Sequence, residues 1–177
     1  MINDRISINE NNIIRIEIKE ENQDYLNRTI KTIQYLINHF DYKESMLWHI
    51  FDSSTDIFTH SSFFDSTFPY RLVIGVKLDE VQDLKMENRQ IFEVIAERIF
   101  RPLKIRENHT NYITFSILHE FGHFLDYRSG NNIHAETINR DNYPTERSFA
   151  MAYRKTRAEK IADDFAIKTF PKLREVL

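Results

Sequence analysis

The first forty residues show the two hydrophobic periods that are typical of strands and helices. Ile14, Ile16 and Ile18 alternate with charged residues, and this spacing of two predicts a strand with one buried face. The next apolar positions follow at steps of four, three, four and three residues, which predicts an amphipathic helix. These positions are Leu26, Ile30, Ile33, Ile37 and Phe40. The chain is therefore expected to begin with a strand followed by a helix.

Two more segments, residues 46–51 and 70–78, are apolar and rich in strand-forming residues. We expect both to be strands, with a bulge at Gly75 in the second. The intervening residues 52–69 are rich in Ser, Thr, Asp and Phe, which is typical of a loop. We expect its phenylalanines to fold back over the core; the alternative is a wall or lid for an apolar substrate segment.

Helical spacing returns in the second half of the chain. Residues 87–100 and 113–127 both repeat apolar positions every three or four residues, and Pro102 prevents simple continuation of the first segment. Gly130 is well placed to end the second helix in a left-handed turn. Residues 130–145 then form a connection to a further helical segment that contains more charged residues.

The second of these helices contains two histidines four residues apart, His119 and His123, with Glu120 beside the first. On a helix this spacing turns both imidazoles to one side, close enough to bind a single ion. The pattern is typical of a zinc site in which the glutamate is a general base for a water molecule. His49, His60 and His109 lack a partner at ligand spacing, and we expect them to be ordinary surface or capping residues.

A catalytic zinc site needs a third protein ligand. A histidine six residues beyond His123 is excluded, because that position is Ser129. Glu159 is the better candidate, since the helical segment 157–166 can turn it toward the metal helix. Asp163 lies one turn further on, where its carboxylate can accept the second ring N–H of His119 and so orient that ligand.

Composition agrees with a small intracellular enzyme. The 177 residues suit one domain, and 41% hydrophobic content provides a sizeable core. Cysteine is absent, so disulfides and thiolate ligands are excluded. The net charge of -3 does not suggest a nucleic-acid surface. No apolar run approaches a membrane span, and no signal-peptide pattern is visible, so we expect a cytoplasmic protein without membrane contact.

The motif from His119 to His123, followed by Glu159, Asp163 and Phe165-Ala166, resembles the gluzincin metallopeptidases, most closely the ImmA/IrrE family. The resemblance covers roughly residues 110–172. It implies a zinc-dependent endopeptidase with His119, His123 and Glu159 as ligands and Glu120 as base. It also implies a protein substrate, such as a helix-turn-helix repressor of a mobile element or stress response.

A second resemblance is to the anthrax-lethal-factor-like peptidase domains, in which a tyrosine upstream of the ligand glutamate stabilises the oxyanion. Tyr153 is the corresponding residue, although it lies six positions before Glu159, one fewer than in that pattern. A donor aimed at developing charge is physically expected in such a site. The alternatives to Tyr153 that lie near it in the sequence are Tyr143, His134 and Arg157.

Together these observations predict an α+β, single-domain, zincin-like fold. It would have a small twisted sheet, packing helices, a metal-binding helix and a C-terminal glutamate helix. Residues 1–110 would form the scaffold and residues 111–172 the zinc-binding core. The predicted function is cleavage of a protein or peptide substrate with Zn²⁺ as cofactor. Two alternatives stay open, a toxin-like effector protease and a non-catalytic protein-binding module; the sequence leaves the oligomeric state undetermined.

Overall fold

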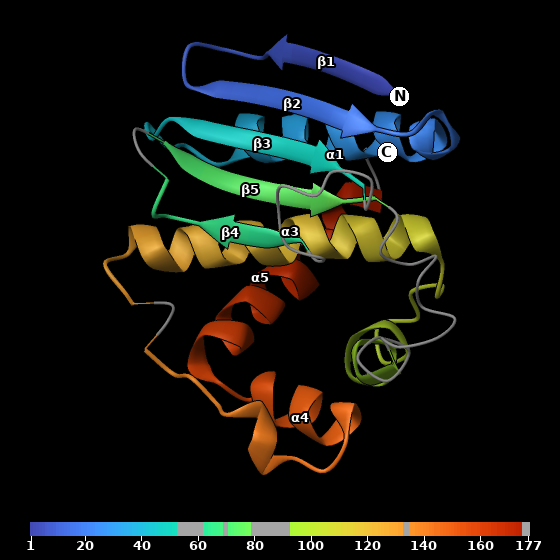
Figure 1. Cartoon of the computed structure of the whole chain (residues 1–177), viewed down its shortest axis with the longest axis vertical. Coiled ribbons are helices and arrows are strands. Elements are labelled where there is room, and N and C mark those ends of the chain that lie inside the picture. Colours follow the sequence, from blue (N-terminus) through green and yellow to red (C-terminus); the bar gives the residue numbers. More distant parts are fainter. Residues whose placement is uncertain (53–61, 69–70, 79–92, 133–134, 175–177) are drawn as a thin grey trace.

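Five strands form one mixed sheet in the computed structural model, which describes residues 1–52, 62–68, 71–78, 93–132 and 135–174 (Figure 1). The strand order is β1-β2-β3-β5-β4. The three central strands are parallel, whereas β1 and β4 run antiparallel to their neighbours at the two edges. The strands are β1 (Ile2–Ser7), β2 (Asn12–Ile18), β3 (Met46–Phe51), β4 (Phe63–Asp65) and β5 (Leu72–Lys77).

The helices lie mainly in the second half of the chain. They are α1 (Gln23–His39), the π-helix η3 (Ala96–Phe100), α3 (His109–Arg128), α4 (Glu146–Tyr153) and α5 (Arg157–Arg174), with short 3-10 turns η1 (Glu20–Asn22) and η4 (Arg140–Asn142). Helix α3 lies between the sheet and the pair α4 and α5 (Figure 1). No helix of the described ranges is long and apolar enough to cross a membrane.

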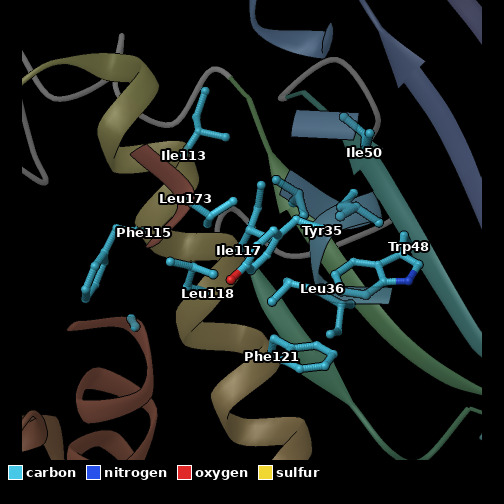
Figure 2. Close-up of a cluster of buried hydrophobic side chains, with 14 of the residues drawn as sticks. Tyr35, Leu36, Trp48, Ile50, Ile113, Phe115, Ile117, Leu118, Phe121 and Leu173 are labelled. Atoms are coloured by element: carbon cyan, nitrogen blue, oxygen red, sulfur yellow. The ribbon is translucent and has the colours of Figure 1, made fainter. Parts of the chain in front are cut away.

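The core forms where even-numbered strand residues face α1 and α3. Ile14, Ile16 and Ile18 are all fully or almost fully buried, as the alternation predicts. Figure 2 shows side chains from one side of α3 directed toward β3 and α1, with Phe115 on the opposite side of that helix. The rings of Trp48 and Phe121 stack at 5.9 Å between centroids. Burying this apolar surface fixes α3 against the sheet.

The predicted central strands and the first helix are confirmed, but both edge strands were missed. Strand β1 has only two apolar residues, the half-buried Ile2 and Ile6, and its other side chains are exposed at the sheet edge. Strand β4 interrupts the segment that we expected to be a loop, so that prediction is wrong for Phe63–Asp65. Phe64 does fold back on the core, where it is 8% exposed; residues 53–61 and 69 lie outside the described residues.

The expected bulge at Gly75 is also wrong. Strands β3 and β5 pair without interruption from Met46 opposite Leu72 to Phe51 opposite Lys77. A β-carbon at Gly75 would lie 2.2 Å from a ring carbon of Phe63. Gly75 is therefore needed because an aromatic ring of the neighbouring strand occupies the space above it.

The remaining helices differ from the sequence prediction in detail. The pattern over residues 87–100 does end in helix, with residues 93–95 and η3 before Pro102, while residues 87–92 lie outside the described residues. Helix α4 was not predicted. Its start is marked by a capping box between Thr145 and Ser148, in which each side chain bonds the backbone of the other residue. The described residues thus form a single α+β domain with a mixed five-stranded sheet.

Candidate metal centre

Helix α3 carries the histidine motif and has well-defined ends. At its start, the Asn108 side chain accepts a hydrogen bond of 2.9 Å from the backbone N–H of Asn111. At its end, Gly130 has φ of +83°, in the left-handed region that closes many helices. These two ends agree with the predicted helix and place the motif in its second half, facing α5.

An ion pair joins the C-terminal end of α3 to the N-terminal end of α5. Asp126 is buried, and its two oxygens accept hydrogen bonds of 2.6 and 3.1 Å from the guanidinium of Arg157. This forked pairing restricts both the distance and the orientation of the two helices. It therefore positions Glu159, which lies two residues after Arg157 in the first turn of α5.

The three predicted ligands converge on one point. The two Nε2 atoms of His119 and His123 are 3.1 Å apart. The Glu159 carboxylate lies 3.3 Å from the Nε2 of His119 and 3.2 Å from that of His123. All three side chains are at most 11% exposed. Among the described residues, no other group of three or more potential ligands brings its donor atoms together in this way.

The spacing of these donor atoms fits a small divalent cation. A tetrahedral zinc ion bonded to nitrogen at 2.0–2.1 Å separates its ligand atoms by about 3.3 Å. The observed separations of 3.1–3.3 Å agree with that geometry. Both imidazoles direct a nitrogen at the other, so lone pairs on both would repel unless a cation or proton lies between them. The donor set is therefore suited to a metal, although it does not select zinc uniquely.

The charges around the donor atoms favour a cation as well. Burial disfavours the protonated form of His119, but hydrogen bonds to Asp163 and Glu159 outweigh it and raise the pKa of His119 to about 9. Burial likewise opposes ionisation of Glu159, yet the two histidines hold the pKa of Glu159 well below its usual range. The site thus stabilises positive charge between these groups.

The predicted hydrogen bond between His119 and Asp163 is present. The Nδ1 atom of His119 lies 2.9 Å from the Oδ1 atom of Asp163, and Asp163 is buried. With its proton on Nδ1, His119 presents the Nε2 lone pair to the other ligands. The neighbouring Asp164 is exposed, so the register predicted for α5 is confirmed. The Nδ1 atom of His123 has no hydrogen-bond partner among the described residues.

Glu120 is half-buried beside the ligands and contributes no donor atom to them. Burial raises the pKa of Glu120, and the negative charge of Glu159 adds to this effect. Electrostatic interaction with His119 and His123 opposes this increase in the pKa of Glu120. A carboxylate with a raised pKa binds a proton more readily near neutral pH, which suits a general base.

Of the residues considered as hydrogen-bond donors to an oxyanion, Tyr153 is the one that lies beside the ligands. It ends α4, is 41% exposed and lies close enough to Glu159 and Glu120 to be affected by their charges. Burial of the other part of the side chain and the charge of Glu159 raise the pKa of Tyr153. Arg157 instead pairs with Asp126, and Tyr143 packs against Phe149. His134 lies outside the described residues.

The sequence reasoning missed Arg154. One guanidinium nitrogen, Nη1, hydrogen bonds to the Oδ1 atom of Asp163 and lies 3.8 Å from an oxygen of Glu159. Its side chain is only 12% exposed. The residue precedes α5 and no ligand spacing identifies it, because the turn between α4 and α5 determines where it lies.

The expectation that His49 is a surface or capping residue is wrong. It is 2% exposed on β3, and its Nε2 atom lies 2.7 Å from a carboxylate oxygen of Glu17 on β2. His49 and Glu17 occupy odd-numbered positions, on the sheet face opposite the core residues of β2 and β3. His109 is the first residue of α3, and its Nε2 contacts the carbonyl oxygen of Leu78. His60 lies outside the described residues.

Comparisons with protein-family models, curated proteins and solved structures found no significant match to this chain. The chemistry of the centre must therefore be inferred from its own residues. Two histidines and a glutamate converge, an aspartate orients one histidine, and Glu120 and Tyr153 lie beside them. Such a set can bind a divalent cation and transfer a proton next to it.

Proposed function

We propose that this protein is a zinc-dependent endopeptidase of the gluzincin type, with a zincin-like fold. The observation that supports this most directly is the convergence of His119, His123 and Glu159, with ligand atoms separated by 3.1–3.3 Å. The adjacent Glu120 is not needed to complete this set, and a carboxylate that does not bind the metal is the feature that favours hydrolysis over simple metal storage.

The charges of the four ionisable groups beside the two imidazoles also fit a divalent ion. Glu120, Glu159 and Asp163 are carboxylates, and Arg154 is the cation closest to them. With all three carboxylates ionised and both imidazoles neutral, the groups carry two net negative charges. Once the His119 proton has been released, a zinc ion would balance these charges, which reduces the free energy needed to keep carboxylates buried.

Zinc bound by these ligands would supply a Lewis acid that makes water more acidic and polarises a peptide carbonyl. Glu120 removes a proton from the attacking water as the water oxygen forms a bond to the carbonyl carbon. The carbon–nitrogen bond of the peptide then breaks, and Glu120 delivers the proton to the departing amine. The products are a carboxylic acid and an amine, so one water molecule is consumed for each bond cleaved.

Two further side chains have supporting roles in this proposal. Asp163 keeps the His119 imidazole oriented through the 2.9 Å hydrogen bond to Nδ1. Tyr153, which lies beside Glu159, donates a hydrogen bond to the oxygen that becomes negatively charged during attack. The resemblance to ImmA/IrrE proteins suggests a regulatory protein, such as a repressor, as the substrate. A repressor substrate would place the reaction in the cytoplasm.

Metal analysis tests the first requirement of this proposal. Protein dialysed against Zn²⁺ should retain about one zinc per chain, because three protein ligands meet at one point. His119→Ala and Glu159→Ala should each lose most of that zinc. Asp164→Ala alters an exposed residue on the same helix and is the matched control. Unchanged zinc content in both ligand variants would show that the metal binds elsewhere.

A further inference from the structure

Arg154 links the end of α4 to two acidic side chains of α5. Its Nη1 atom hydrogen bonds to the Oδ1 atom of Asp163 and lies 3.8 Å from the Oε2 atom of Glu159. The side chains involved are 5–12% exposed, so these charges interact with little screening by solvent. A guanidinium placed in this way stabilises carboxylates that would otherwise be buried without a positive partner.

The position of Asp163 depends on two donors that bind the same oxygen. Its Oδ1 atom accepts from Arg154 on one side and from the Nδ1 atom of His119, at 2.9 Å, on the other. With both donors present, rotation of the carboxylate breaks two charge-assisted hydrogen bonds. Without Arg154, the hydrogen bond from His119 would be the only one that orients the carboxylate within the described part of the chain, and Asp163 would be less well fixed.

We propose that Arg154 is a positioning residue. It keeps Asp163 oriented, so that His119 donates from Nδ1 and directs Nε2 toward His123 and Glu159. The part of this inference that concerns zinc affinity rests on the proposed function. The hydrogen bonds that connect Arg154 to Asp163 and Asp163 to His119 are independent of the proposed function, because they are present in the protein without metal.

A simple counter-charge would act in the opposite direction, which makes the inference testable. If Arg154 only reduced the negative charge of the centre, its removal would increase the attraction for a divalent cation, and zinc would bind more tightly. If Arg154 positions Asp163, its removal loosens a ligand histidine, and zinc binds more weakly. Losses of about 10- to 100-fold are typical when the residues that orient metal ligands are changed.

The experiment compares two variants. Arg154→Met removes the charge but keeps a long side chain, and Arg154→Lys keeps the charge but lacks the planar guanidinium group. Arg147→Met is the matched control, because Arg147 lies on α4 and pairs with Glu93 and Glu97. Zinc affinity is measured by competition with a chelator. We expect a loss of about 10-fold for Arg154→Met, a smaller loss for Arg154→Lys and none for the control.

A second measurement uses the protein without metal. Proton NMR should detect the ring N–H of His119 that Asp163 protects from exchange with water, and Asp163→Asn assigns the signal by removing it. We expect faster exchange of this proton in Arg154→Met than in wild type, with Arg147→Met unchanged. Circular dichroism verifies that each variant folds. If Arg154→Met does not fold, Arg154→Lys tests the inference instead. A pure counter-charge role predicts wild-type zinc affinity and wild-type proton exchange for Arg154→Lys, because lysine keeps the charge.

Zinc affinity that is unchanged or increased in folded Arg154→Met, together with wild-type proton exchange, would overturn the inference. Failure of the proposed function has a different result: wild-type protein would bind no zinc at the three ligands, while the exchange measurement on the metal-free protein still reports whether Arg154 orients Asp163. The two hypotheses therefore fail independently.

Discussion

Gly122 of α3 and Ala162 of α5 lie where the two helices approach each other closely. A β-carbon at Gly122 would lie 2.7 Å from the α-carbon of Ala162 and 3.1 Å from its carbonyl oxygen. Both residues are buried next to site residues in the sequence, Gly122 beside the proposed ligand His123 and Ala162 beside Asp163, which orients His119. The small residues therefore allow the backbones to approach closely enough for Glu159 to reach both histidines.

Gly122→Ala should separate the two helices, because the new methyl group meets backbone atoms that cannot rotate away. We expect the free energy of unfolding to fall by roughly 1–3 kcal/mol, as is typical of overpacked sites. Zinc affinity should fall as well, since the Glu159 carboxylate moves away from the imidazoles. Chemical denaturation and chelator competition measure the two effects.

Gly130→Ala is the control for that substitution. Gly130 has φ of +83°, and a β-carbon there would meet no atom within 4 Å. Alanine in this left-handed conformation should cost about 1 kcal/mol of stability from backbone strain. Zinc affinity should be unaffected. If Gly122→Ala binds zinc as tightly as Gly130→Ala does, the close approach does not control the ligand geometry.

Glu120→Gln separates metal binding from catalysis. The amide is nearly the same size as the carboxylate but cannot accept the proton of water, so cleavage should fall by at least about 100-fold. Zinc content should remain at the wild-type level, because Glu120 is not among the three converging ligands. The measurement is cleavage of a candidate repressor by wild-type and variant protein. Equal rates would contradict the role of Glu120, and no cleavage by either would favour a non-catalytic binding module.

The ligand set could be predicted from the sequence because the spacing of residues along a helix depends only on neighbouring positions in the chain. His119 and His123 lie on one helix, and Glu159 and Asp163 lie one turn apart on another, so the period of the α-helix fixes each pair. Only the packing of α3 on α5 had to be assumed, and that packing brings His119 and Asp163 within 2.9 Å. The same locality explains β2, whose isoleucines alternate with charged residues, and β3, which is a short apolar run.

Features that depend on contacts between distant segments were not predicted. Arg154 meets Asp163 only because α4 and its turn return the chain to α5. His49 is buried because strand pairing brings Glu17 next to it, a contact across 32 residues of sequence. The edge strands lack a clear apolar alternation, since one is mostly polar and the other has only three residues. In each case the tertiary structure determines the environment, and the local pattern does not.

Asp163→Asn should weaken the orientation of His119 without unfolding the protein. Asparagine keeps the size and one acceptor oxygen but removes the negative charge that favours the Nδ1–H hydrogen bond. Zinc affinity or activity should fall by about 10- to 100-fold. Asp164→Asn, on the exposed side of α5, should leave both unchanged. Similar losses in the two variants would indicate a general effect of charge rather than orientation of His119.

The pair of Glu17 and His49 should make stability depend on pH. Burial lowers the pKa of His49 despite its hydrogen bond to Glu17. Burial has the opposite effect on Glu17, but hydrogen bonds from Arg15 and His49 outweigh it and lower the pKa of Glu17. Both groups therefore bind protons more readily in the unfolded chain than in the folded protein. The contribution of this pair to stability should be fully present above the ordinary histidine pKa of 6.5 and should decrease as the pH falls below it, with Glu17 adding to the loss below 4.5.

His49→Gln tests the histidine part of this dependence. Glutamine can donate a hydrogen bond to Glu17 but does not titrate, so the variant should lose less stability than wild type between pH 7.5 and about pH 5. Urea denaturation of the metal-free proteins at the two pH values measures the difference. His39→Gln is the control, because His39 is an exposed histidine at the end of α1. An equal loss of stability in wild type and His49→Gln would mean that His49 does not contribute to acid sensitivity, and the buried pair would then be structural only.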